Sequence, residues 1–122
     1  MTMRAAAPML HVPDVATTAE WYRALGFELV DLGRECDDGE VVFALLRCGP
    51  SQLMLSAGGR PSDADRREVD LYVHVDDVAA TRAAFGDRGE IVEDLHDTFY
   101  GAREFIVRDP NRFWITFGER TS

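Results

Sequence analysis

Apolar and polar residues along the chain predict the same order of elements twice. In each half a short alternating strand is followed by a helical stripe and then by three further strands, and residues 58–61 (Gly-Gly-Arg-Pro) mark a break between the halves. The predicted strands cover residues 7–12, 27–33, 40–48, 51–56, 69–75, 90–96, 102–108 and 112–118. We therefore expect one α+β domain spanning residues 1–122. Its two βαβββ repeats would cover about 5–56 and 69–118, joined by a linker at 57–68.

Each predicted helix begins after an aspartate and ends near a glycine. Asp14 and Asp77 are suited to cap the first turn through a side-chain oxygen, and Gly26 and Gly89 stand where a left-handed C-terminal residue is expected. The apolar stripes at helical spacing are Val15, Thr18, Tyr22 and Leu25 in the first helix and Val78, Thr81 and Phe85 in the second.

The two halves are also related residue by residue. Residues 10–30 align with residues 73–93, and the paired identities are His11/His74, Val12/Val75, Asp14/Asp77, Val15/Val78, Ala16/Ala79, Thr18/Thr81 and Gly26/Gly89. Phe43 to Leu55 resembles Phe105 to Phe117 in the same way, as a strand, a turn and a strand. Such self-similarity indicates one structural unit used twice.

The composition is that of an acidic globular protein. Hydrophobic residues make up 46% of the chain, and 22 acidic residues against 13 basic ones, all arginine, give a net charge of −9. The chain therefore lacks the basic surface that nucleic-acid binding needs, and without lysine it cannot form a Schiff base. The negative charge either favours a neutral or cationic small ligand or serves solubility alone.

The sequence contains no feature that points to a membrane or to secretion. No apolar run approaches the roughly 20 residues that span a bilayer, and residues 1–8 lack the apolar core of a secretion signal. We therefore expect a cytoplasmic protein with no membrane partner. Cys36 and Cys48 have no CxxC spacing, so we expect both to be reduced.

Two stretches of the sequence resemble a known family. Val-Pro-Asp-Val at 12–15 leads to Trp-Tyr-Arg-Ala-Leu-Gly-Phe at 21–27, and Tyr-Gly-Ala-Arg-Glu-Phe at 100–105 leads to Asp-Pro-Asn at 109–111. They resemble motifs of the vicinal-oxygen-chelate superfamily, which includes glyoxalase I, extradiol dioxygenases, fosfomycin-resistance proteins and bleomycin-resistance proteins. The second stretch is similar to the "WG-x-REF…DP-x-G" segment of the bleomycin-resistance branch. The resemblance implies paired βαβββ modules forming a curled eight-stranded mixed sheet, with half-barrels around a cleft and the helices outside.

Strand alternation then predicts which side chains face that cleft. In that branch an aromatic residue before the G-x-REF segment stacks on the drug, which implies this role for Tyr100, with Phe99 beside it. Our candidate ligand-binding residues are Phe43, Gln52, Met54, Asp70, Tyr72, His74, Phe99, Tyr100, Trp114 and Thr116. Such residues also have a structural interpretation, because methionines fill gaps in cores and histidines bond to strand-end backbone. We expect His96 at the surface.

The resemblance also locates the metal ligands of metal-dependent family members. Their four positions correspond to Ala7, Met54, Asp70 and Thr116 in this sequence. Only Asp70 is a usual ligand for Zn²⁺, Ni²⁺, Fe²⁺ or Mn²⁺, which need about three His, Cys or carboxylate ligands. We therefore expect no metal and no other cofactor. A shifted site built from His11, His74 and Asp70 is the alternative.

The sequence thus predicts a metal-free protein that resembles bleomycin-resistance proteins and sequesters a flat, partly cationic small molecule, as in antibiotic resistance. Members of that branch form homodimers with ligand grooves between subunits, so a homodimer is implied. The alternative is a glyoxalase- or isomerase-like enzyme that uses His74, His11 or Asp70 as acid or base, without a metal or with atypical metal ligands. Tyr100 and Arg112 replace the branch's usual tryptophan and glycine, which leaves the drug open.

Overall fold

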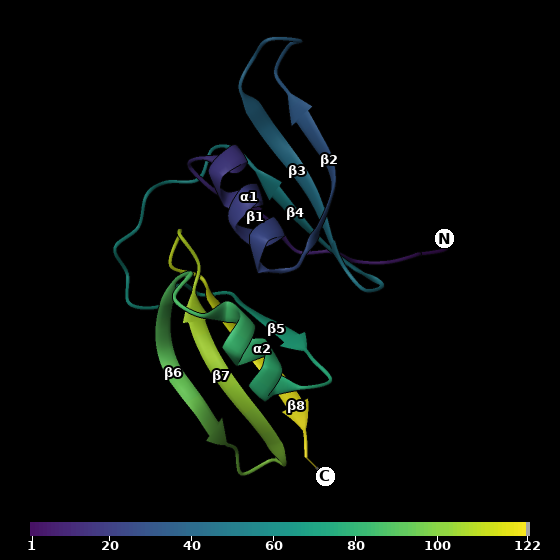
Figure 1. The fold of residues 1–122 in the computed structure, drawn as a ribbon. Helices are drawn as coiled ribbons and strands as arrows, with labels where there is room; N and C mark the ends of the chain where they lie inside the picture. Colours follow the sequence, from purple (N-terminus) through teal and green to yellow (C-terminus); the bar gives the residue numbers. More distant parts are fainter. Residues whose placement is uncertain (122) are drawn as a thin grey trace. The chain divides into compact units, whose positions relative to one another are not determined.

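Eight strands and two helices follow one another through residues 1–121, the part of the chain that the computed structural model describes (Figure 1). The first five elements are β1 (Met9–His11), α1 (Val15–Leu25), β2 (Glu28–Arg34), β3 (Val41–Cys48) and β4 (Ser51–Ser56). The second five are β5 (Asp70–His74), α2 (Val78–Phe85), β6 (Glu90–Asp97), β7 (Ala102–Arg108) and β8 (Trp114–Arg120). The chain divides into two compact units, residues 1–61 and the residues from Ser62 onward.

Each unit contains one mixed four-stranded sheet. The strand order is β1-β4-β3-β2 in the first unit and β5-β8-β7-β6 in the second. The first strand of each unit pairs in parallel with the last, and the other pairs are antiparallel. The predicted α+β fold of two βαβββ modules is confirmed.

The aspartates cap both helices as the sequence predicts. A carboxylate oxygen of Asp14 accepts a hydrogen bond from the Thr17 amide, and one of Asp77 accepts from the Ala80 amide, each at 3.0 Å. These bonds satisfy donors that the first helical turn leaves without an internal partner.

The helix of the second unit packs on its sheet through aromatic rings. Phe85 of α2 lies 6.2 Å from Phe105 of β7, measured between ring centroids, and Phe105 stacks on Phe117 of β8 at 4.9 Å. All three side chains are buried. Since side chains alternate along a strand, the neighbours of Phe105 and Phe117 point to the opposite face of the sheet.

Two sequence-based boundaries in the second unit are wrong. Gly86 (φ 61°), not Gly89, ends α2, because the helix is one turn shorter than the alignment with α1 predicts. The last strand begins at Trp114 rather than at residue 112. Asp109 Oδ1 accepts bonds from the Asn111 and Phe113 amides, and Arg112 takes a left-handed conformation (φ 70°), so the turn extends to Phe113.

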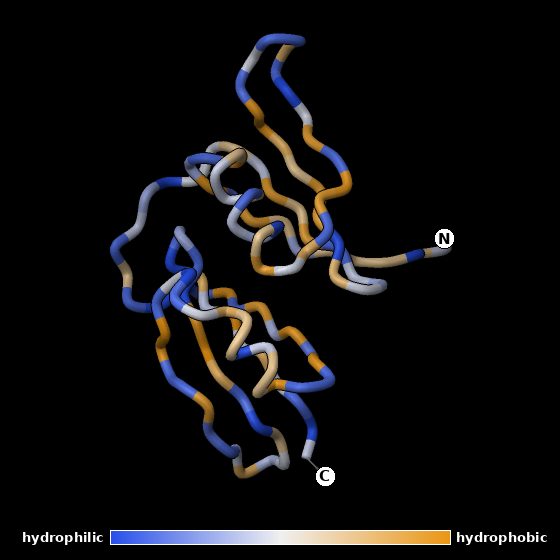
Figure 2. Tube along the Cα trace, in the orientation of Figure 1, coloured by the Kyte–Doolittle hydropathy of each residue, from blue (hydrophilic) through white to orange (hydrophobic). Residues whose placement is uncertain are grey.

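Figure 2 shows apolar residues concentrated along the strands and mainly hydrophilic residues in the segment that joins the two units. Within residues 1–121, neither helix has the length and apolarity needed to cross a membrane.

Candidate functional site

A row of polar residues and one glycine crosses the second sheet on the face opposite α2. His74 of β5 pairs with Gly118 of β8, Gly118 with Glu104 of β7, and Glu104 with His96 of β6. Glu104 directly precedes the buried Phe105, and Gly118 directly follows the buried Phe117. Because successive residues of a strand face opposite sides of the sheet, both lie on the side away from the helix. This row is the structural basis of the candidate site.

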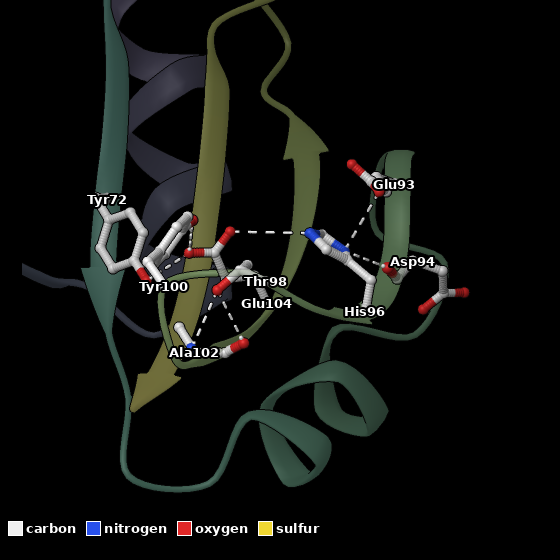
Figure 3. A network of polar contacts seen from close by, with 8 residues as sticks. All are labelled: Tyr72, Glu93, Asp94, His96, Thr98, Tyr100, Ala102 and Glu104. Carbon is white, nitrogen blue, oxygen red and sulfur yellow. Dashed lines mark hydrogen bonds and ion pairs between the residues drawn. The ribbon is translucent and has the colours of Figure 1, made fainter. Parts of the chain in front are cut away.

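Glu104 is the centre of a hydrogen-bonded network (Figure 3). Its side chain is buried, and its Oε2 accepts hydrogen bonds from the hydroxyl groups of Tyr72, at 2.7 Å, and Tyr100, at 2.5 Å. Its Oε1 lies 3.9 Å from Nε2 of His96. A buried carboxylate is tolerated only when hydrogen-bond donors replace water, and the two phenols do so here.

His96 is held in place by the strand that carries it. Its Nδ1 lies 2.9 Å from the carbonyl oxygen of Asp94 and 3.6 Å from Oε1 of Glu93. The side chain of His96 is one quarter exposed, so it lies partly at the surface, as expected, while its Nε2 faces Glu104.

Gly118 makes room for Tyr72. A Cβ atom built on Gly118 would lie 1.9 Å from the hydroxyl oxygen of Tyr72, far inside van der Waals contact. The phenol of Tyr72 therefore crosses β8 directly over this glycine to reach Glu104. Here glycine is required by the close approach of a side chain rather than by a turn.

Tyr100 reaches the same carboxylate from the turn between β6 and β7. Thr98 closes this turn, because its hydroxyl accepts a bond from the Ala102 amide at 3.1 Å. Gly101 adopts a positive φ of 82° in the turn. Phe99 is fully exposed, and its ring meets that of Tyr100 edge to face at 5.1 Å.

A hollow of about 240 Å³ lies beside the two phenols. The lining residues are Tyr72, His74, Tyr100, Ala102 and Arg120. The rings of Tyr72 and His74 lie 4.8 Å apart, and Tyr72 and Tyr100 are about half exposed. Aromatic walls with a few polar groups are the usual composition of a small-molecule site.

The environment keeps both phenols protonated. Burial, together with the hydrogen bond to the Glu104 carboxylate, raises the pKa of Tyr72 to about 12. The bond to Glu104 is also the main reason why the pKa of Tyr100 lies above its ordinary value. Losing either proton would place a second negative charge beside Glu104.

The first unit has no equivalent of this network. The paired positions there are His11, Ser56 and Phe43, which correspond in the ladders to His74, Gly118 and Glu104. Phe43 is half-buried and packs against Gly33. The same fold therefore accommodates an aromatic residue where the second unit has a buried carboxylate, so the fold itself does not demand Glu104.

The structure brings together some of the residues predicted from sequence. Tyr72, His74 and Tyr100 line the hollow, and Phe99 flanks Tyr100. Thr116 pairs with Tyr72 and is buried.

Asp70 and Trp114 lie elsewhere on the same sheet. They pair with each other on the same face of the sheet, and the pair of Tyr72 with Thr116 lies between them and the pair of His74 with Gly118. Asp70 forms an ion pair with Arg66 at 2.5 Å, and the Arg66 guanidinium lies 4.2 Å from the centroid of the Trp114 ring. The indole nitrogen of Trp114 donates to the Asp65 carbonyl at 3.0 Å. Both residues are thus engaged in holding the segment that precedes β5.

The remaining candidates belong to the first unit. Met54 of β4 pairs with Met9 of β1, and Gln52 is exposed. Nδ1 of His11 lies 3.4 Å from the carbonyl oxygen of Ala57. The histidine thus contacts strand-end backbone, as its structural interpretation predicts.

The family's metal positions do not fit a metal ion in this chain. Ala7 has no ligand atom, the Met54 thioether is a poor ligand for hard cations, and the carboxylate of Asp70 is paired with Arg66. Among residues 1–121, no three His, Cys, Asp or Glu side chains gather closely enough to hold a metal ion.

Three residues of the site were missed in the sequence. Glu104 lies within the Arg-Glu-Phe segment on which the family resemblance rests, and alternation with Phe105 could have placed it on the cleft face. Gly118 and Arg120 gave no comparable signal, because only the pairing of β8 with β5 and β7 brings them to the hollow.

Comparisons with known proteins agree with this fold. The family model described as Glyoxalase/Bleomycin resistance protein/Dioxygenase superfamily matches residues 4–117. None of the curated proteins compared matches the sequence. Among solved structures, TioX from a Micromonospora species is 23% identical, with a TM-score of 0.76, and the match covers 97% of this chain and 99% of that one. That likeness concerns the fold.

Two further structures share slightly more of the sequence. A protein from Agrobacterium tumefaciens is 26% identical, with a TM-score of 0.74, over 98% of this chain and 95% of that one. A bleomycin-binding protein from bleomycin-producing Streptomyces verticillus, solved in complex with copper(II)-bleomycin, is also 26% identical. Its TM-score is 0.66, and the match covers 96% of each chain.

Proposed function

The chain belongs to the Glyoxalase/Bleomycin resistance protein/Dioxygenase superfamily, and from that premise we propose that it binds a flat, partly cationic small molecule without changing it chemically. The ligand occupies the hollow beside Tyr72 and Tyr100. Its aromatic part stacks on the phenol rings, and its positive charge faces the side of the sheet that carries Glu104. This binding requires no metal or other cofactor.

The observation that carries the proposal is the buried carboxylate of Glu104 behind two half-exposed aromatic rings. Aromatic faces attract cations through their quadrupole, and a nearby carboxylate adds to that attraction. The net charge of −9 acts in the same direction. The 26% identity with a bleomycin-binding protein supports the choice of ligand class.

Isothermal titration calorimetry with bleomycin tests the proposal. We expect saturable binding with a dissociation constant of about 1 μM or tighter. Tyr100→Ala removes one stacking surface and should weaken binding about tenfold. Arg103→Ala is the control, because Arg103 is an exposed neighbour of Glu104 on the same strand. Absence of saturable heat with bleomycin, or unchanged affinity in Tyr100→Ala, would contradict the proposal.

One observation favours a second candidate, acid–base catalysis on a small metabolite. His74 lines the same hollow as the two phenols that donate hydrogen bonds to the Glu104 carboxylate. An imidazole beside a bound substrate is a suitable general acid or base. This function predicts a product detectable by mass spectrometry that disappears in His74→Ala. Recovery of the ligand unchanged from both proteins would exclude it for that ligand.

We also propose that the protein forms a homodimer, as the resemblance to the bleomycin-resistance branch implies. Large apolar side chains are exposed in both units, among them Met9, Val30, Val69 and Phe99. Exposed apolar surface of this kind is common at interfaces between protein chains.

A further inference from the structure

The network around Glu104 fixes which atoms the two phenols can offer to a ligand. From this geometry we infer that the hollow selects ligand groups that donate hydrogen bonds at Tyr72 and Tyr100, such as amidinium, guanidinium or ammonium, and discriminates against groups that only accept. The inference rests on the proposed function, whose site it concerns.

The argument begins with a count of hydrogens. A phenol has one hydrogen to donate and lone pairs with which to accept. The hydrogens of Tyr72 and Tyr100 both point to Oε2 of Glu104, at 2.7 and 2.5 Å. Each oxygen therefore presents only lone pairs to the hollow, so a ligand group must supply the hydrogen.

The arrangement resists competition from a ligand. Hydrogen bonds to a carboxylate are stronger than those between neutral groups. If an acceptor on a ligand took a phenolic hydrogen, Glu104 would lose one of its hydrogen-bond donors, although this residue is only 3% exposed. Leaving a buried charged group without its partners is costly. Because the pKa of Tyr72 is raised to about 12, its hydrogen remains in place through the physiological pH range.

Arg120 contributes a guanidinium to the same hollow. It is the charged residue among the five that line the hollow, and a guanidinium only donates. A group that only accepts can therefore bind at Arg120 alone, without a hydrogen bond to either phenol, whereas a group that donates can bond to both phenols. Arg120 and the two phenols together orient a ligand that carries both kinds of group.

The divergence of the two units supports a role in ligand selection. Phe43 occupies the position equivalent to Glu104 in the first unit. A hydrophobic residue there would avoid the desolvation of a carboxylate. The fold does not require the carboxylate in the second unit, so we attribute its presence to the hydrogen bonds that it accepts from Tyr72 and Tyr100.

Three probes of one shape test the inference in the 122-residue chain. Benzamidinium, benzamide and benzoate share a ring and a planar head group but differ in hydrogen bonding: the first only donates, the second does both, and the third only accepts. Their affinities follow from amide chemical shifts in NMR titrations up to about 10 mM, the range expected for fragments. We expect benzamidinium to bind about tenfold more tightly than benzoate, with benzamide between them.

Variants then assign the preference to Glu104. Glu104→Met frees both phenolic hydrogens and should reduce the preference for benzamidinium over benzoate at least fivefold, or about 1 kcal/mol. Glu104→Gln keeps an acceptor but loses the charge and should give an intermediate preference. Asp97→Asn is the control, since it removes one negative charge from an exposed residue of the same unit. Should Glu104→Met fail to fold, Glu104→Gln alone decides, because an unchanged preference in that variant contradicts the inference.

The outcomes separate this inference from the proposed function. If bleomycin binds but benzoate binds as tightly as benzamidinium, donor selection is wrong and the proposed function remains. If bleomycin binds and none of the three probes does, donor selection at this hollow is likewise wrong. An equal loss of preference in Glu104→Met and Asp97→Asn would show that net charge, not the phenolic hydrogens, determines the selection, and would also overturn the inference.

Discussion

Glu104 is a buried carboxylate enclosed by two phenols and an imidazole. Each contact restrains a side chain that would otherwise rotate freely at the surface of a sheet, so one acidic residue sets the position of two aromatic rings. The sequence alone predicted Tyr72 and Tyr100 as site residues through alternation and resemblance, and both line the hollow. It did not reveal Glu104, because a glutamate in a strand of arginines and apolar residues also fits a solvated edge.

The raised pKa of Tyr72 gives a prediction for stability at high pH. In the folded protein the phenol keeps its proton up to a pKa of about 12, against 10.0 when unperturbed. Between these values the unfolded chain binds fewer protons than the folded one, so the free energy of unfolding should fall as the pH rises. Below pH 10 this contribution is fully present. Urea denaturation at several pH values measures the effect.

Tyr72→Phe is the test variant for this dependence. It removes the titrating group while keeping the ring, so the decline between pH 10 and 12 should become shallower. Tyr100→Phe is the matched comparison, because it leaves the Tyr72 phenol in place and should keep Tyr72's share of the decline. An identical slope in the parent protein and in Tyr72→Phe would contradict the assignment.

The elements of the two units follow from short local signals. The caps at Asp14 and Asp77 were predicted correctly because an N-cap depends on residues within one turn. The end of α2 was not predicted correctly, since Gly86 and Gly89 are both acceptable C-terminal residues and local sequence does not distinguish them. The turn before β8 was misplaced because Arg112 adopts a conformation that glycine usually takes. Its guanidinium also donates to the Ala64 carbonyl, a contact distant in sequence.

A short helix should depend strongly on its cap. α2 has eight residues, and the carboxylate of Asp77 bonds to the Ala80 amide while Glu119 bonds to the Val78 amide at 2.8 Å. We expect Asp77→Ala to lower the free energy of unfolding by about 1 kcal/mol and Asp77→Asn to have a smaller effect. Thermal and urea unfolding measure the change. Asp76→Ala removes the same charge one residue earlier and should be nearly neutral, so equal effects at both positions would contradict a capping role.

At the scale of the whole molecule, the sequence predicted the duplicated architecture correctly. The repeated motif His-Val-x-Asp-Val-Ala at residues 11–16 and 74–79 is contiguous in the chain, so it can be recognised from the sequence alone. The family model covers residues 4–117. The different side chains at equivalent positions of the two units could not be predicted in the same way. They depend on which residues meet across strands, such as Glu104 with Gly118 and Phe43 with Ser56.

The proposed homodimer predicts the mass of the protein in solution. Analytical ultracentrifugation should give twice the 13.7 kDa of one chain, with dissociation on dilution as mass action requires. Bleomycin should shift the equilibrium toward the dimer if both copies contribute to its binding. A mass of 13.7 kDa at all concentrations, with and without bleomycin, would contradict the proposal.

Gly118 limits how this protein can change over evolutionary time. Because the Tyr72 ring occupies the space where any other residue would place its first carbon, an exchange at position 118 would displace that ring and disturb the acidic centre that it serves. A lineage that keeps Tyr72 must keep Gly118 as well. The two positions, separated along the chain but adjacent in the sheet, are therefore inherited as a pair.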